Sequence, residues 1–334
     1  EIIEEGLGGR STGELRQLLA HADQRIRLKA QFELVKRNET DSLIEDSADD
    51  HQLKRIHAIW GLGQLARKEN QAAIKQLVSL LKDKDPEIQV QSSKVLADLK
   101  PGSFDGRVLI PHLSSEHPRV RFQAGLSVGR QQVSEAFDAV IALIEQNDGQ
   151  DTYLRHAGIV ALEGMSRANS LLNHPSEEVR LSAVVALRRL ASPLVATFLS
   201  DASELVVVEV ARAIHDDFSI PEVLPTLAKQ LVFTESSNEA LVRRLINANF
   251  RLGGVNEAYL VAEYAANTSH ETAMRLEALE ALAAWTNPPP LDRVDGRRRY
   301  YTPRPSGEIA SAIGGMLESI LASNDSGILE KTVA

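Results

Sequence analysis

The sequence contains no cysteine among its 334 residues. This absence excludes a disulfide-stapled scaffold, a zinc site built on thiolates, a thiol nucleophile and the covalent attachment of a c-type haem. Aromatic residues are also scarce, at 4%, so the core must consist mainly of Leu, Ala, Val and Ile, which favours helices over a β-sandwich or a propeller. No apolar run approaches the roughly 18 residues that a membrane span requires, and the best candidate, 205–210, is interrupted by Glu209.

Positive charge is also in short supply, because 37 Lys and Arg face 46 Asp and Glu, which leaves a net charge of -9. This balance argues against a nucleic-acid binder that works through its overall field. Hydrophobic residues make up 43% and charged residues 25% of the chain, which is typical of a folded protein rather than a disordered one. No signal peptide is visible, and the chain opens at Glu1 without an initiator Met. We therefore expect a mature or trimmed piece of a longer protein.

Catalytic motifs are missing as well, since the sequence has no phosphate-binding loop, dinucleotide fingerprint or nucleophile elbow. Segment 270–274 begins like a zinc-protease helix, but Met274 stands where the second His is needed. Segment 79–82 has a Ser-Lys spacing without its partner motifs, and it is interpreted as a helix surface. The nine His residues show no recognised ligand spacing. We predict no catalytic, cofactor-binding or metal-binding residues and a chain that is not an enzyme.

What the sequence does contain is internal repetition. One pattern recurs: a turn residue such as Asp23, an aliphatic residue such as Ile26, usually an Arg directly after it, and a small residue such as Ala30. The position after the aliphatic residue, called here the ladder position, returns at intervals of about 25 to 36 residues, as solenoid repeats do. It is occupied by Arg27, Arg55, Gln89, Arg121, Arg155, Arg180, Val207, Arg243 and Arg275.

Each copy of the pattern predicts two helices. A short amphipathic segment comes first, the turn residue follows, and a second helix then carries apolar residues on one face, as Val179, Ala183 and Leu187 do. Small residues such as Ala30 and Ala124 allow neighbouring helices to approach closely. Neither helix can bury its apolar face alone, so consecutive pairs must stack. The sequence predicts an all-α solenoid of about nine helix pairs over residues 1–286.

The composition changes beyond this array. Three prolines at 288–290 stop the preceding helix, and a Pro/Arg-rich strap is predicted over 287–306. We expect this strap to be ordered and non-helical, because Tyr300 and Tyr301 are residues that flexible linkers lack. Its tyrosines should pack on the final repeats, and its arginines should pair with neighbouring carboxylates. Residues 307–334 are predicted to form a final helix and the start of a truncated further repeat.

The candidate partner-binding surface consists of polar residues on the second helices and in the strap, because second helices usually line the concave face of such solenoids. Three readings stay open beside it: Arg155 and Arg243 as structural ladder residues, Asn247 and Asn249 as partners of loop backbone, and 297–299 as a solvated segment lying against acidic surface. The candidates are His57, Trp60, Arg155, His156, Arg188, Arg189, Arg244, Asn247, Asn249, Arg251, Arg297, Arg298 and Arg299.

The repeat pattern of residues 14–285 resembles HEAT repeats. In that family the turn Asp caps the second helix, and the Arg at the ladder position pairs with turn carboxylates of a neighbouring repeat. The resemblance implies that Arg121 and Arg180 pair with turn acids of adjacent repeats and are structural. Gln89 and Val207 depart from the family's ladder.

A narrower resemblance rests on segments 24–34, 57–63, 153–158, 245–254 and 285–296. Together they are similar to the HEAT segment of haem-binding, membrane-bound dehydrogenase-like proteins of bacteria, planctomycetes in particular. In that family a sugar-dehydrogenase-like β-propeller precedes the helical segment, and a cytochrome c domain with a Cys-x-x-Cys-His motif follows it.

The narrower resemblance implies a non-catalytic scaffold, the middle module of a periplasmic or secreted oxidoreductase. Its partners would be a protein or the propeller and cytochrome c domains of the same polypeptide, with no nucleic acid and no membrane span in this chain. A stand-alone cytoplasmic interaction adaptor is the alternative. A HEAT-type enzyme or nucleic-acid binder, such as a helical DNA glycosylase or a bilin lyase, is disfavoured by the acidic charge and the missing catalytic motifs.

Overall fold

The computed structural model describes residues 6–217, 219–302, 304, 306–322 and 327–328. The chain divides into two compact units, residues 1–168 and 169–334. Each unit has its own set of stacked helix pairs and its own apolar core. The repeat pattern in the sequence continues through residue 168 without a break and does not mark this division.

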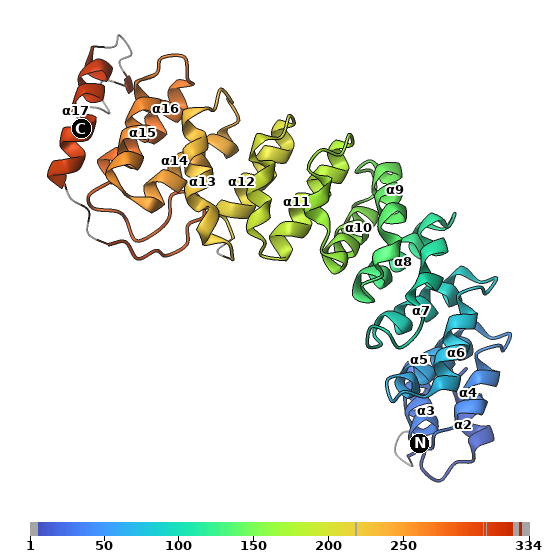
Figure 1. The fold of residues 1–334 in the computed structure, drawn as a ribbon. Helices are drawn as coiled ribbons and strands as arrows, with labels where there is room; N and C mark the ends of the chain where they lie inside the picture. Colours follow the sequence, from blue (N-terminus) through green and yellow to red (C-terminus); the bar gives the residue numbers. More distant parts are fainter. Residues whose placement is uncertain (1–5, 218, 303, 305, 323–326, 329–334) are drawn as a thin grey trace. The chain divides into compact units, whose positions relative to one another are not determined.

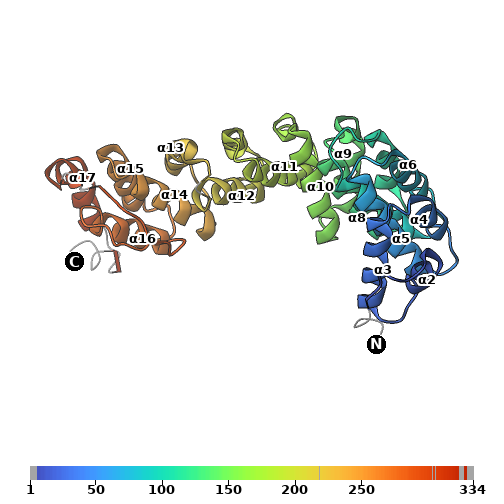
Figure 2. The same cartoon turned by 90° about the horizontal axis from the view of Figure 1, so that it is seen from below.

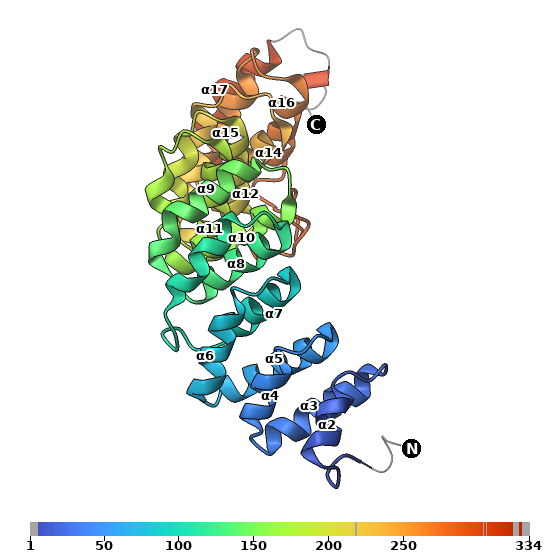
Figure 3. The same ribbon diagram turned by 90° about the vertical axis from the view of Figure 1, so that its right-hand side faces the viewer.

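In the first unit the helices follow one another in chain order (Figures 1 and 3). The second helices stack on each other in the order α3, α5, α7, α8 and α10. The elements are α2 (Thr12–Leu18), α3 (Gln24–Lys36), α4 (Thr40–Asp46), α5 (Gln52–Ala66), α6 (Gln71–Leu80), α7 (Pro86–Ala97), η1 (Gly106–Ser114), α8 (Pro118–Arg130), η2 (Ser134–Ala136), α9 (Phe137–Asn147) and α10 (Thr152–Met165).

In the second unit Figure 2 shows α13, α15 and α17 in one layer and α12, α14 and α16 in the other. The second helices α11, α12, α14 and α16 again contact one another in sequence. The elements are η3 (Ala168–Leu171), at the junction of the two units in the sequence, α11 (Glu177–Arg189), η4 (Pro193–Ser200), α12 (Glu204–His215), η5 (Pro221–Val223), α13 (Leu224–Lys229), η6 (Gln230–Val232), α14 (Glu239–Leu252), α15 (Val255–Ala266), α16 (Thr272–Ala283) and α17 (Ser306–Leu321).

The predicted all-α solenoid is confirmed. Over the described part of the chain, nine helix pairs run from α2/α3 to α15/α16 when the 3₁₀ segments η1, η3 and η4 are taken as first helices. One of these segments, η1, contains Pro111 in its interior, and a proline there cannot donate the backbone bond that an α-helix needs. Extended pairing within the described ranges is confined to one bridge, between Leu291 and Arg298.

The turn residues of the repeat start the second helices, as the pattern predicts. The side chain of Asp23 accepts a hydrogen bond from the backbone of Arg25, and Ser176 accepts one from Val179 in the same way. Such caps satisfy backbone N–H groups that have no partner inside the helix. The turn therefore determines where each second helix begins.

The ladder position has a common local task in both units. Its side chain reaches back to backbone carbonyls of the turn before its own helix: Arg121 donates to Ser115 (2.7 Å), Arg180 to His174 (2.7 Å), and Gln89 to Asp83 (2.6 Å). Glutamine can therefore replace arginine here, since only one donor is needed. These bonds tie α7, α8 and α11 to their own turns.

The second expected task, pairing with an acid of the next repeat, holds for only some ladder arginines. Arg180 forms a two-point pair with Asp201, with distances of 2.7 and 3.0 Å, and Arg55 pairs with Asp83. The expectation is wrong for Arg121, which donates to the carbonyls of Ser115 and Glu116 rather than to a carboxylate. Among these three arginines, an ion pair to the next repeat is therefore formed by Arg55 and Arg180 but not by Arg121.

Replacement of Arg180 by alanine should lower the free energy of unfolding of the second unit by about 1 to 3 kcal/mol, since hydrogen bonds to charged groups contribute that much. Asp201, whose side chain is 2% exposed, would lose its counter-charge. Arg121→Ala, the matched control in the first unit, removes carbonyl bonds only and should cost less. Calorimetric unfolding of both variants measures the difference, and equal losses would contradict the role of the acid.

The described part of the strap contacts the final repeats. Residues 287–302 are ordered without helix, and Arg293 in this segment pairs with Glu277 (2.9 Å) and Glu280 (2.6 Å) of α16. Tyr301 packs edge-on against Phe250, with ring centroids 5.7 Å apart. The expectation that both tyrosines pack is wrong for Tyr300, which is 87% exposed.

The strap ends on an aromatic cluster. The Arg304 guanidinium donates to the carbonyls of Trp285 (2.9 Å) and Phe250 (2.5 Å) and lies over the rings of Phe250, Trp285 and Tyr301. Helix α17 then begins at Ser306, close to the predicted start. The predicted truncated repeat falls mostly on 323–326 and 329–334, which lie outside the described residues.

Helices long and apolar enough to cross a bilayer do not occur within the described ranges.

Candidate functional site

Two of the predicted surface residues on α5 contact neighbouring helices of the first unit, His57 as a buried side chain and Trp60 as a half-buried one. His57 is 2% exposed, and its ring lies 4.9 Å from that of Trp60 in an edge-on contact. The indole N–H of Trp60 donates to Gln91 on α7 at 2.8 Å. A buried ring cannot contact a partner, so the assignment of His57 to a binding surface is corrected: it joins α5 to α3.

The geometry around His57 determines which of its nitrogens carries the proton. Nε of Arg27 donates to Nε2 of His57 at 3.0 Å, so Nε2 must be the acceptor. Nδ1 lies 2.9 Å from Oε1 of Gln31, an atom that only accepts, so Nδ1 must carry the hydrogen. If Nε2 were protonated as well, its N–H would face the N–H of Arg27, and this hydrogen bond would be lost. Burial, aided by the charge of Arg27, lowers the pKa of His57 to about 4.

The stability of the first unit should therefore depend on pH between about 6.5 and 4. In this range the unfolded chain binds a proton at His57 and the folded chain does not, so acid favours unfolding by up to roughly 3 kcal/mol. We expect His57→Gln to flatten this part of the profile and His156→Gln, an exposed control on α10, to leave it unchanged. Unfolding free energies from urea titrations at several pH values measure the slopes. Identical slopes in wild type and His57→Gln would refute the assignment.

Four other predicted residues remain at or near the surface of their own units. His156 is exposed on α10, beside the half-buried Arg155, which has a polar or electrostatic partner. On α11 Arg189 is exposed, and Arg188 pairs with Glu209 of α12 at 3.2 Å. Arg155 and His156 belong to the first unit, and Arg188 and Arg189 belong to the second.

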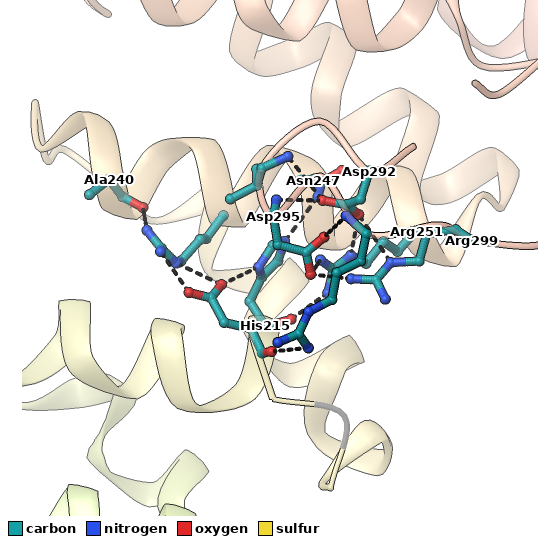
Figure 4. A network of polar contacts seen from close by, with 11 residues as sticks. His215, Ala240, Asn247, Arg251, Asp292, Asp295 and Arg299 are labelled. Atoms are coloured by element: carbon teal, nitrogen blue, oxygen red, sulfur yellow. Dashed lines mark hydrogen bonds and ion pairs between the residues drawn. The ribbon is translucent and has the colours of Figure 1, made fainter. Parts of the chain in front are cut away.

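Most of the remaining predicted residues converge at the place where the strap crosses α12 and α14, shown in Figure 4; Asn249 and Arg298 do not take part. The centre is Asp292 of the strap, whose side chain is fully buried. Its carboxylate accepts hydrogen bonds from Arg251 (2.8 Å), Arg299 (3.3 Å) and Asn247 (2.8 Å). Backbone N–H groups of Val294 and Asp295 donate to the same carboxylate. Two helical residues and three strap residues thus share one buried anion.

The charge of Asp292 is held in place by its surroundings. Burial alone would favour the neutral acid, but the hydrogen bond and the positive charge of Arg251 outweigh it and hold the pKa of Asp292 well below its usual range. Asp295 adds a second carboxylate, which lies 3.2 Å from Arg251 and also pairs with Arg299. Two acids and two arginines therefore form a closed charge cluster between the strap and α14.

A second arm of the network reaches the end of α12. Asn247 lies 3.0 Å from the ring of His215, whose other nitrogen contacts Asp216 at 2.7 Å. Arg244 forms a two-point pair with Asp216, at 3.0 and 2.7 Å, and Arg251 donates to the carbonyl of His215. Burial lowers the pKa of His215, so the ring is neutral near pH 7 and acts as a hydrogen-bonding joint between helices.

The two asparagines of α14, Asn247 and Asn249, have different roles, which the sequence had left open. Asn249 is fully buried and donates to the carbonyls of Ala228 and Leu245, both at 2.9 Å. It therefore bonds backbone, but the backbone of helices α13 and α14 rather than that of a loop, so the expectation of a loop partner is wrong. Asn247 is equally buried, but it binds Asp292 and His215 instead of loop backbone. Neither side chain is accessible, so both are removed from the partner-binding surface.

The arginine run 297–299 splits into different roles. Arg299 is drawn into the charge cluster. Arg297 is exposed and donates to the carbonyl of Asp216 at 3.2 Å. Arg298 is exposed, with its guanidinium 5.5 Å from the ring of Tyr300. The strap thus lies against the repeats on one side and presents Arg298 and Tyr300 on the other.

Sequence reasoning selected the arginines and asparagines of this network but missed its anions and its histidine: His215, Asp216, Asp292 and Asp295. The one available signal was Asp292 and Asp295 inside an otherwise basic strap, since acids at such a place can pair with its own arginines. The separation of 45 positions between Asn247 and Asp292 hides the pairing from any local pattern.

The chemistry of this site is that of a structural joint. His215, Asp216, Asp292 and Asp295 are each engaged by neighbouring side chains. Groups of three or more His, Cys, Asp or Glu arranged to hold a metal ion are not found in the described part of the chain.

Comparisons with known proteins give a likeness of fold and little more. No protein-family description matches the chain, and no curated protein matches it. An engineered protein solved by crystallography has 17% identity and a TM-score of 0.41, over 96% of this chain and 97% of that one.

Two natural proteins are similar to the same degree. The complex of CpcE and CpcF of phycocyanin lyase from Nostoc sp. PCC7120 has 18% identity and a TM-score of 0.37, over 83% of this chain and 94% of that one. YibA of Escherichia coli has 16% identity and a TM-score of 0.34, over 82% and 97%.

Proposed function

We propose that this chain is a non-catalytic HEAT-repeat scaffold, the middle module of a multidomain haem-binding dehydrogenase-like protein in the periplasm or outside the cell. The observation that supports it most is the strap. It follows α16 and is anchored to the repeats at Asp292 and at Arg304. The segment is built as a rigid connection rather than a tether.

A rigid connection is what a spacer between domains needs. A flexible linker of this length would let the following segment sample a large volume, and each ordered residue costs about 1 to 2 kcal/mol of backbone entropy. Here the ion pairs of Arg293 with Glu277 and Glu280 add to the buried carboxylate of Asp292 and offset that cost. A domain attached beyond α17 would then keep a defined position relative to the second unit.

The residues of this chain do not fit the covalent attachment of haem. A c-type haem is bound through two cysteines, and the chain has none. Its buried histidines are occupied, His57 by Arg27 and Gln31 and His215 by Asn247 and Asp216. We therefore place redox chemistry in other domains of the proposed parent protein and assign none of its steps to this chain.

The proposal is tested on the gene and on the intact parent protein. The reading frame should encode a propeller before this chain and a Cys-x-x-Cys-His motif after it. Cross-linking with mass spectrometry should connect the flanking domains to the second unit, and Asp292→Ala should scatter those cross-links while a control such as Glu222→Gln keeps them. A reading frame that encodes the repeats alone would overturn the proposal.

A stand-alone protein-interaction adaptor is the second candidate. The observation in its favour is a group of exposed apolar side chains in the second unit, Leu205, Val232 and Phe233. Contiguous exposed apolar side chains mark contact sites for proteins, and Val232 and Phe233 are neighbours in the chain. The same gene sequence separates this candidate from the first one.

A further inference from the structure

The second unit contains one ladder position without a polar side chain, Val207 on α12. In the repeat before it, Arg180 donates to the turn carbonyls six and five residues earlier, those of His174 and Pro175. The corresponding carbonyls for Val207 belong to Asp201 and Ala202, and they receive no hydrogen bond from the residues that the structure describes. The place for a guanidinium is present, and the guanidinium is missing.

A cavity of about 550 Å³ lies at this place. Its floor is apolar, because Val207 is joined there by the buried side chains of Leu199, Leu241 and Leu245. Asp201 and Ala202 line the same cavity. A long aliphatic stem with a donor at its end would find apolar contact along its length and two carbonyl acceptors beyond it.

The rim of the cavity carries negative charge only. Asp201, Glu204 and Glu235 line it, and no Lys, Arg or His does. Asp201 is already paired with Arg180, and Glu204 accepts a hydrogen bond from Ser236. Glu235 is exposed and forms no ion pair or hydrogen bond with another described residue. The turn position that Asp201 holds before α12 is held before α14 by Ser236, which accepts a hydrogen bond from the backbone of Asn238. Glu235 directly precedes Ser236, so the carboxylate available at this rim is that of Glu235.

We propose that this cavity binds an arginine side chain from an extended segment of a partner protein, which takes the place of the missing ladder arginine. This inference rests on the proposed function as an interaction module. The guanidinium donates to the carbonyls of Asp201 and Ala202 and to the carboxylate of Glu235. Arginine suits the site better than lysine, because its planar fork reaches several acceptors at once. Phe233, which lines the cavity and is 75% exposed, offers apolar contact to residues beside that arginine.

The test uses the full chain and a fluorescein-labelled peptide, Gly-Leu-Arg-Leu-Gly, followed by fluorescence anisotropy. A peptide with citrulline in place of arginine has the same shape without the charge and should bind at least about tenfold more weakly. Val207→Arg should fill the cavity from within and weaken binding of the arginine peptide by about tenfold or more. Val207→Leu, the matched control, should retain binding, and Glu235→Gln should weaken it.

Equal affinity for the two peptides, no binding of the arginine peptide, or unchanged binding by Val207→Arg would each overturn the inference. A thermal melt of Val207→Arg that is equal to or above wild type shows that the variant is folded. If the occupant is a second copy of this chain, sedimentation will show a dimer that Val207→Arg dissociates, and the partner-protein assignment is then wrong. If the arginine and citrulline peptides bind with equal affinity while the cross-links in the parent protein are intact, this inference is overturned and the scaffold proposal still stands.

Discussion

Replacement of Gly164 by alanine should destabilise the first unit by about 3 kcal/mol or more, the upper end of what overpacked sites cost. Gly164 lies on α10 and faces Gly129 on α8, and a Cβ at Gly164 would sit 2.0 Å from the carbonyl oxygen of Gly129. This neighbour is backbone, so no side chain can rotate away. The two helices would have to separate, and the packing of their whole contact would be lost.

A side chain at Gly129 on α8 would also clash with the backbone of α10. A Cβ at Gly129 would lie 2.4 Å from the carbonyl oxygen of Val160, so Gly129→Ala should have an effect of similar size. Gly13→Ala on α2 is the control, since nothing lies within 4 Å of a Cβ there, and it should be neutral or stabilising by up to about 1 kcal/mol. Urea unfolding followed by circular dichroism measures all three variants. Equal stability of Gly164→Ala and Gly13→Ala would show that the helices can move apart freely.

Replacement of Asp292 by asparagine should release the strap. The variant keeps the shape of the side chain but removes the charge that faces Arg251 and Arg299, whose side chains are 7% and 11% exposed. Breaking one partner out of a buried pair typically costs about 3 to 5 kcal/mol. Asp295 remains beside both arginines. We therefore expect the free energy of unfolding to fall by about 3 kcal/mol, near the lower end of that range.

Limited proteolysis measures the release of the strap directly. In wild type, trypsin should cleave slowly at 297–299, because Arg299 is engaged by Asp292 and Asp295. In Asp292→Asn the same bonds should be cut quickly while the helical repeats stay intact. Glu222→Gln, which removes an exposed charge from the same unit, is the control. Rapid cleavage of the wild-type strap would mean that it is a loose tether.

The stability that Asp292 contributes is lost when the pH falls, not when it rises. The pKa of Asp292 is lowered in the folded chain, so its stabilising contribution is complete above the ordinary carboxyl pKa near 4 and is lost only as pH falls toward the lowered value. The strap should therefore stay bound from neutral to mildly acidic pH. Trypsin is inactive in strong acid, so pepsin cleavage below about pH 4 is the suitable probe for its release.

The fold could be predicted from the sequence because its signals are local. A helix pair is specified within one repeat by a capping residue such as Asp23, an apolar stripe on the second helix, and a small residue such as Ala30. Repetition of that unit about nine times then requires stacking, since no pair can bury its apolar face alone. The ordered strap was also predictable, because prolines exclude a helix there and its tyrosines and arginines need surfaces to contact.

The hydrogen-bond and ion-pair partners of the polar side chains, by contrast, were decided by the tertiary structure. The sequence predicted His57 and Trp60 as surface residues, yet stacking of α5 on α3 buries His57, and the half-buried Trp60 donates to Gln91 of α7. Arg251 read as a binding residue, but its acids come from the strap, 41 and 44 residues further along the chain. The close approach of Gly129 and Gly164 likewise exists only because α8 and α10 pack together. Periodicity fixes which face of a helix is apolar, whereas the partner of a polar side chain depends on which distant segment packs there.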